Sequence, residues 1–184
     1  MKVLAICGSL RAASYNRSLL RTAAELAPAG MEVEMAEIRG IPVFDEDLEK
    51  EGMPEAVAEL RLRAKAADGL LIGCPEYNYG IAGPLKNAVD WLSRPHGEPR
   101  TPFINRPVAI LGASMSLIGT ARAQAQLRQT LQGCGALTMP SPEVYVIRAQ
   151  DKFDAEGKLT DQQTRDAVGR LMAAFGTWIA RLKG

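Results

Sequence analysis

The 184-residue sequence has little of the chemistry on which many enzymes rely, because it contains one histidine, His96, and three widely spaced cysteines. A single histidine excludes a histidine-rich metal site. A Ser-His-Asp hydrolase is also disfavoured, since the chain lacks the G-x-S-x-G elbow. We expect His96 to be a solvated residue of a polar loop. Cys7, Cys74 and Cys134 form no C-x-x-C pair. An odd number of separated cysteines fits a reducing compartment, here the cytoplasm, better than a disulfide-bonded scaffold.

Long apolar runs and an excess of one charge are also missing. No run approaches 18 apolar residues, so we expect no membrane span, and the apolar run at the N-terminus is too short for a signal peptide. The 22 Lys and Arg residues nearly balance the 21 Asp and Glu residues. This balance disfavours nucleic-acid binding, which needs a clustered basic excess, and it lacks the acidic surplus of a small electron carrier. The length predicts one domain over residues 1–184.

Alternating strand and helix patterns run along the whole chain. Three continuous apolar runs predict strands that are covered on both faces, at Val3–Ile6, Gly69–Gly73 and Val108–Leu111. Weaker strand patterns are an edge strand at Glu32–Ile38 and the pair Ala136–Met139 and Val144–Ile147, which the breaker PSPE separates. Helical patterns cover Arg17–Leu26, a helix opened by Pro54, Gly83–Trp91, Thr120–Leu131 and a last helix that starts at Thr160 with Gln163 completing a capping box. The alternation predicts a three-layer α/β sandwich with about five parallel strands.

The loop after the first strand reads CGSLRAASYNRS, from Cys7 to Ser18. Its glycine allows close backbone approach, its short hydroxyl and amide side chains donate hydrogen bonds, and Arg11 adds a bidentate cation. The following helix presents unpaired N–H groups, so the loop is typical of a phosphate cradle. It is neither a Walker loop nor a G-x-G-x-x-G fingerprint. Ser14 or Asn16 acting merely as a helix cap is an equally good interpretation of the loop taken alone.

Two further loops lie at the same predicted edge of the sheet. The loop after Gly73 places Glu76, Tyr77, Asn78 and Tyr79 in an exposed turn, where two aromatic rings and an amide suit a flat heteroaromatic ligand. Tyrosine rings that simply cover the strand ends would explain the same residues. The loop from Gly112 is a polar strand-to-helix turn. We interpret Cys7 and Cys74 as buried structural cysteines, since neither has a paired thiol.

Taken together, the loops resemble the NAD(P)H-dependent FMN reductase family, flavodoxin-like enzymes that include quinone and chromate reductases. The matching segments are GSLRAASYN (8–16) and PEYNYGIAGPLKNAVDW (75–91), and the resemblance runs along essentially the whole chain. The family commonly has S-T-G-x-x-G-G in the third loop, where this chain has SMSLIGT (114–120). The resemblance implies a flavodoxin-like sandwich that uses FMN as cofactor and NADPH or NADH as electron donor.

Carried over residue by residue, the resemblance assigns the FMN phosphate to Ser9, Arg11, Ser14 and Asn16. It assigns the isoalloxazine, largely through backbone groups, to Pro75, Glu76, Tyr77 and Asn78. Ser114 would bound the far side, with Ser116 beside it. The flavin carries the redox chemistry, so we expect no catalytic acid or base and no metal. The implied acceptor is a quinone, free flavin or a similar small molecule, reduced by a ping-pong mechanism, and the implied assembly is a homodimer or homotetramer.

Two other classes of protein stay open at this point. One is a flavodoxin-type electron carrier, which binds FMN but does not oxidise NAD(P)H itself. The other is a nucleotide hydrolase on a similar fold, for which Glu76 is the one candidate carboxylate in the three loops.

Overall fold

Six parallel strands form the central sheet of the computed structural model, which describes residues 1–183. The sheet has the order β2-β1-β3-β6, and β7 and β8 both pair with β6. The strands are β1 (Lys2–Cys7), β2 (Glu32–Ala36), β3 (Gly69–Gly73), β6 (Pro107–Ala113), β7 (Leu137–Thr138) and β8 (Val144–Val146). The strand order reverses at β1, because β2 lies on one side of β1 and the next strand along the chain, β3, lies on the other side. The carboxyl ends of β1 and β3 therefore flank the topological switch point, where ligands bind in open α/β sheets.

The fifth strand position of the predicted sheet is occupied by two short strands, β7 and β8. β7 pairs with the start of β6, where Val108 lies opposite Thr138, and β8 pairs with its end, where Ala113 lies opposite Val146. The residues between β7 and β8 include the Pro-rich PSPE segment, which cannot continue a ladder. The prediction of about five parallel strands is therefore confirmed, and the fifth strand position is interrupted at the predicted PSPE breaker.

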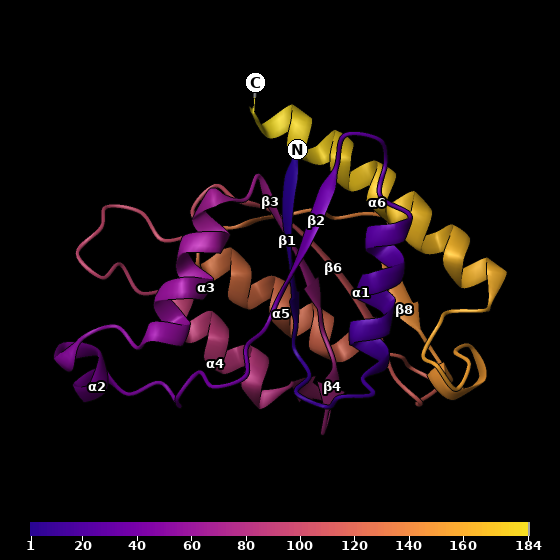
Figure 1. The fold of residues 1–184 in the computed structure, drawn as a ribbon, viewed down its shortest axis with the longest axis horizontal. Helices are drawn as coiled ribbons and strands as arrows, with labels where there is room; N and C mark the ends of the chain where they lie inside the picture. Colours follow the sequence, from indigo (N-terminus) through magenta and orange to yellow (C-terminus); the bar gives the residue numbers. More distant parts are fainter. Residues whose placement is uncertain (184) are drawn as a thin grey trace.

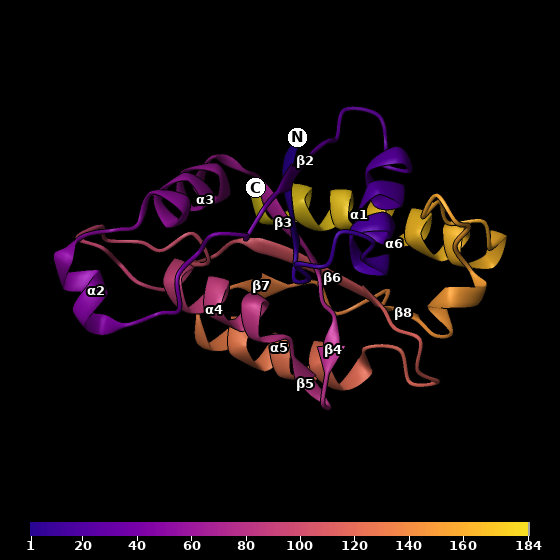
Figure 2. The ribbon, with the colours of Figure 1, turned by 60° about the horizontal axis from the view of Figure 1, so that its bottom comes forward.

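Helices cover both faces of the sheet, as the continuous apolar strands require (Figure 1). On one face, α1 (Tyr15–Glu25) and α6 (Gln162–Lys183) pack against side chains such as Val3 and Ala5. On the other face, α3 (Glu55–Ala66), α4 (Gly83–Leu92) and α5 (Ala121–Gly133) pack against side chains such as Leu4 and Ile6. Figure 2 shows α1 and α6 above the sheet and α4 and α5 below it. The three-layer prediction is confirmed.

The last helix begins later than predicted. Its N-terminus is capped by Asp161, whose carboxylate accepts a hydrogen bond from the Thr164 N–H at 3.0 Å. The Thr160 hydroxyl instead donates to the Lys152 carbonyl at 3.1 Å. The predicted capping box of Thr160 and Gln163 is therefore wrong by one position. Three hydrogen bonds to Asp161 from Thr164 and Lys152 lower the pKa of this carboxyl to about 2.

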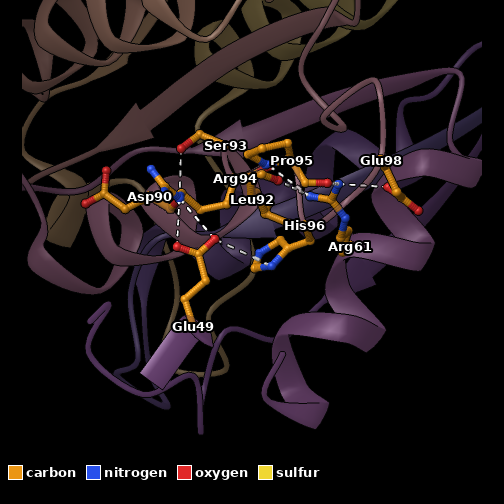
Figure 3. Close-up of polar contacts among 9 residues, drawn as sticks. All are labelled: Glu49, Arg61, Asp90, Leu92, Ser93, Arg94, Pro95, His96 and Glu98. Carbon is orange, nitrogen blue, oxygen red and sulfur yellow. Dashed lines mark hydrogen bonds and ion pairs between the residues drawn. The ribbon is translucent and has the colours of Figure 1, made fainter. Parts of the chain in front are cut away.

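The prediction that His96 is solvated is wrong (Figure 3). Its side chain is 8% exposed, its ring stacks on Trp91, and its Nδ1 lies 3.6 Å from Glu49 Oε1. The Ser93–Pro102 segment folds back because the buried Arg61 guanidinium donates to the carbonyls of residues 94 and 95 and to the Glu98 carboxylate. The segment is irregular and mostly exposed or half-buried, but its histidine packs inward.

Four short elements were not predicted. They are α2 (Glu46–Glu51), the hairpin β4 (Glu76–Tyr77) and β5 (Gly80–Ile81), and the 3₁₀ helix η1 (Ala149–Asp151). Each has between two and six residues, too few for a periodic apolar pattern to develop. No helix within residues 1–183 has the length and apolar character needed to span a bilayer.

Candidate functional site

Three loops meet at the carboxyl ends of β1, β3 and β6 and enclose a cavity of about 190 Å³. Seven of the ten predicted site residues line it, together with Tyr15 and Met115, which were not predicted. The seven are Ser9, Arg11, Ser14, Asn16, Pro75, Tyr77 and Ser114. Larger hollows exist, such as one of about 280 Å³ at the amino ends of β1 and β2, but that hollow is lined partly by Glu32 and Glu34 and lies away from the three loops.

The Ser9–Ser14 loop leaves its backbone donors available. Arg11 is the one residue between positions 9 and 16 whose backbone N–H has an acceptor among the described residues, the Ser9 hydroxyl at 3.3 Å. Ser14 is the N-cap of α1 and accepts from the Arg17 N–H at 3.4 Å. The N–H groups of Tyr15 and Asn16 in the first turn therefore stay available for an anion.

The Arg11 guanidinium lies 5.1 Å from the centre of the Tyr15 ring, at the mouth of the same cavity. None of the nine lining residues is acidic. The nearby Glu37 is engaged in an ion pair with Arg17, which lowers the pKa of its carboxyl. Hydroxyls, unpartnered N–H groups and one exposed cation, with no carboxylate beside them, form a donor set that fits a phosphate dianion.

Asn16 has a structural bond that the sequence could not show. Its side-chain amide donates to the Ala113 carbonyl at 3.0 Å and accepts from the Ala113 N–H at 2.9 Å. The side chain is buried and both of its functional ends are used, so Asn16 ties α1 to the end of β6. The part of Asn16 left for a ligand is its backbone N–H.

Gly8 sets the distance between the first and second loops. A Cβ atom at this position would lie 2.7 Å from Pro75 Cδ and 2.9 Å from Leu85 Cβ, so a larger residue would force the loops apart. The adjacent thiols of Cys7 and Cys74 are buried. Burial raises the pKa of Cys7, and burial together with the Glu76 charge raises the pKa of Cys74 to about 12. Both cysteines are thiols at neutral pH, as their interpretation as structural residues requires.

The second loop forms the β4–β5 hairpin. Asn78 and Tyr79 occupy its tip with φ of 50° and 67°, the two positive values of a type I′ turn. Asn tolerates this conformation better than most residues, which gives Asn78 a backbone role. Tyr77 and Tyr79 are exposed, and Tyr77 lines the cavity while Asn78 does not.

The Glu76 side chain points to α5 and does not line the cavity. Its Oε2 accepts from the Ala123 N–H at 3.0 Å, and its Oε1 lies 3.6 Å from the Arg122 guanidinium. Both carboxylate oxygens are engaged and the side chain is 9% exposed. This arrangement removes the one carboxylate on which a nucleotide hydrolase at these loops would depend.

The third loop closes the cavity with Ser114 and Met115. The Ser116 hydroxyl donates to the Gly119 carbonyl at 3.2 Å and pairs with the Ser114 hydroxyl at 3.2 Å, so it shapes the turn and does not line the cavity. Met115 is 61% exposed beside Tyr77, which adds an apolar edge to the opening. Met115 could not be predicted as a site residue, because a methionine between two serines forms no recognisable motif. Tyr15 could not be predicted either, because its position in the first helical turn is equally compatible with packing in the helix.

Comparison with known proteins agrees with this geometry. Residues 1–151 match the family model described as NADPH-dependent FMN reductase. The chain is 48% identical over 184 residues to an NAD(P)H-dependent FMN reductase of Pseudomonas aeruginosa, with 100% of this chain and 98% of the relative covered. It is 42% identical over 186 residues to a quinone reductase of Escherichia coli strain K12, with 100% and 97% covered.

Among solved structures, the flavoenzyme NAD(P)H:(acceptor) oxidoreductase of Paracoccus denitrificans is similar with a TM-score of 0.87 and 34% identity, over 98% of this chain and 97% of that one. The flavodoxin-like fold implied by the resemblance is thereby confirmed. The chain belongs to the NADPH-dependent FMN reductase family.

Proposed function

We propose that this chain is an FMN-dependent NAD(P)H oxidoreductase that reduces a quinone, free flavin or a similar two-electron acceptor. The observation that carries the proposal is the convergence, on one cavity, of an acid-free donor loop and an exposed aromatic hairpin. Family membership supports the same activity, and the named relatives include both FMN reductases and quinone reductases.

The first loop would hold the phosphate of FMN. Ser9 and Ser14 offer hydroxyls and Arg11 offers a guanidinium, while Tyr15 and Asn16 also line the cavity and their N–H groups have no acceptor among the described residues. Charge-assisted hydrogen bonds of this kind are the stronger ones in proteins, so this loop would supply much of the affinity.

The second and third loops would hold the flavin ring. Pro75, Tyr77 and Ser114 line the cavity. Glu76 and Asn78 would contribute backbone groups, as the family resemblance implies. Ser116 would act through the shape of its turn.

Bound FMN would supply the redox chemistry, namely acceptance of a hydride from NAD(P)H and delivery of two electrons to the acceptor. The residues that line the cavity would orient the flavin and shield it from water, because none of these nine residues carries an acidic or imidazole group. Cys7 and Cys74 are buried and do not line the cavity, and burial raises the pKa of both thiols. Tyr77 and Met115 at the exposed edge leave an opening through which donor and acceptor can pass in turn.

The assembly and compartment are further parts of the proposal. The family resemblance supports a homodimer or homotetramer, in which residues 1–184 form one FMN-binding domain. The unpaired cysteines support the cytoplasm, where thiols stay reduced.

Steady-state assays of NADPH and NADH oxidation with a quinone acceptor test the activity directly. We expect turnover that requires FMN and gives parallel lines in double-reciprocal plots, since donor and acceptor share one opening. FMN that binds tightly but supports no NAD(P)H oxidation would overturn the proposal in favour of an electron carrier. No binding of FMN would overturn the cofactor assignment.

A further inference from the structure

We propose that Glu76 and Gln126, together with Arg122, are positioning residues that fasten the β4–β5 hairpin to the N-terminus of α5 and so fix the ring side of the FMN site. The inference rests on the proposed function, because it takes the hairpin as the wall of the flavin site. It assigns a role to two residues of α5, Arg122 and Gln126, that do not line the cavity.

The backbone N–H groups in the first turn of α5 need a hydrogen-bond acceptor from elsewhere in the chain. Its own N-cap residue, Thr120, makes no side-chain capping bond, since its hydroxyl accepts from Gln124 Nε2 at 2.9 Å. The Ala123 N–H is satisfied by Glu76 Oε2 at 3.0 Å, from 47 residues away in the sequence. A carboxylate at this end of a helix is also favoured by the helix dipole. The hairpin thus provides the missing cap.

Arg122 connects this cap to the tip of the hairpin. Its guanidinium lies 3.6 Å from Glu76 Oε1 and 4.0 Å from the centre of the Tyr79 ring. A guanidinium over an aromatic face is attracted by the ring quadrupole. One side chain of α5 therefore contacts both the start of β4 and the turn.

Gln126, one helical turn further along, forms one hydrogen bond with the turn and one with the returning strand β5. Its Nε2 donates to the Tyr79 carbonyl at 3.2 Å, and its Oε1 accepts from the Ile81 N–H at 3.3 Å. A Cβ on the intervening Gly80 would lie 3.2 Å from Gln126 Oε1, tighter than an ordinary contact. The glycine therefore lets the amide approach the backbone.

The hairpin depends on these contacts because it has little stability of its own. Its ladder contains two residue pairs, and an isolated two-stranded hairpin is marginal in water. Tyr77 is 52% exposed and Tyr79 is 65% exposed, so burial contributes little at the tip. Since α5 also follows directly after the third loop, the same contacts hold the second and third loops at a fixed distance.

The test measures the amide hydrogen exchange of the hairpin in the absence of flavin, and then the affinity of the protein for FMN. Amide hydrogen exchange of residues 76–82 is recorded in the apoprotein of wild type, Gln126→Ala, Glu76→Ala and Glu76→Gln. FMN affinity of each is then measured by quenching of flavin fluorescence. Gln129→Ala is the matched control for Gln126→Ala, because Gln129 is exposed on the same helix and its side chain makes no hydrogen bond within the described residues. Asp45→Ala, which removes the side-chain cap of α2, controls for loss of a helix cap.

We expect faster exchange of residues 76–82 in Gln126→Ala and Glu76→Ala, and an FMN Kd raised about tenfold, as the loss of one or two hydrogen bonds implies. Glu76→Gln should remain close to wild type in exchange, since its amide oxygen still accepts from the Ala123 N–H. Both controls should keep the wild-type exchange of residues 76–82 and the wild-type FMN Kd.

Unchanged exchange and unchanged FMN Kd in both alanine variants would overturn the positioning role. If Glu76→Ala does not fold, the exposed Gln126 decides the outcome alone. Failure of the wild-type protein to bind FMN would contradict the proposed function instead, while the exchange of the apoprotein would still report on the tether.

Discussion

The Ser9–Asn16 loop lines the cavity with polar side chains, whereas the Pro75–Ile81 loop lines it with Pro75 and the Tyr77 ring and directs its one carboxylate, that of Glu76, to α5. Ser9, Arg11 and Ser14 line the opening, while the carboxylate of Glu76 caps α5 and Asn78 serves its turn. The first loop thus uses side-chain chemistry for recognition, and the second uses backbone shape. The difference follows from the ligand parts that they would meet, because a phosphate needs donors while a flat ring needs a rigid wall.

Asn16 is the exception within the first loop, and its replacement gives the largest expected effect. Asn16→Leu leaves the Ala113 N–H and carbonyl without partners in a buried site, which costs about 3 kcal/mol of unfolding free energy. Urea unfolding of the apoprotein measures this loss. An apoprotein of unchanged stability would contradict the structural role of the Asn16 side chain and would show that Asn16 behaves like its neighbours in the loop.

Arg11 should behave in the opposite way. Its side chain makes no hydrogen bond within the described residues, so Arg11→Ala should leave apoprotein stability nearly unchanged. Loss of one charge-assisted bond to phosphate should raise the FMN Kd by about ten- to a hundredfold. Isothermal titration with FMN and with riboflavin separates the two ligand parts. A variant that weakens both ligands equally would contradict the assignment of Arg11 to the phosphate.

Asn78 should tolerate one substitution and not another. Because its φ is 50°, Asn78→Gly should be nearly neutral, while Asn78→Val should destabilise the hairpin by about 1–2 kcal/mol. The FMN Kd should follow the same order, with Val weaker than Gly. If Gly and Val weaken FMN equally, then the Asn78 amide itself contacts the flavin, and the second loop also recognises by side chain.

The sequence predicted the parts of the fold that carry a regular pattern. Val3–Ile6, Gly69–Gly73 and Val108–Leu111 are apolar without interruption because helices cover both of their faces, and each lies within an observed strand. Each strand of the β4–β5 hairpin has two residues, which is too short for an alternating pattern from which the hairpin could be predicted. His96 was misjudged because its inward position depends on Arg61, which is 35 positions earlier and holds the loop around it.

The candidate site was predictable by location and only partly by role. Strand ends locate the loops, and seven of the ten residues line one cavity. Asn and Glu suit both ligands and backbone, so the roles of Asn16 and Glu76 depend on Ala113 and Ala123, which lie 97 and 47 residues away. Such long-range partners leave no trace in a local motif.

The absorbance spectrum of the purified protein, taken with FMN before and after anaerobic NADPH, tests the central claim most directly. We predict a flavin spectrum that is perturbed by binding and that bleaches when NADPH is added, in wild type and more weakly in Arg11→Ala at limiting FMN. A bound flavin that stays oxidised with both NADPH and NADH, or a protein that leaves the spectrum of free FMN unchanged, would contradict it.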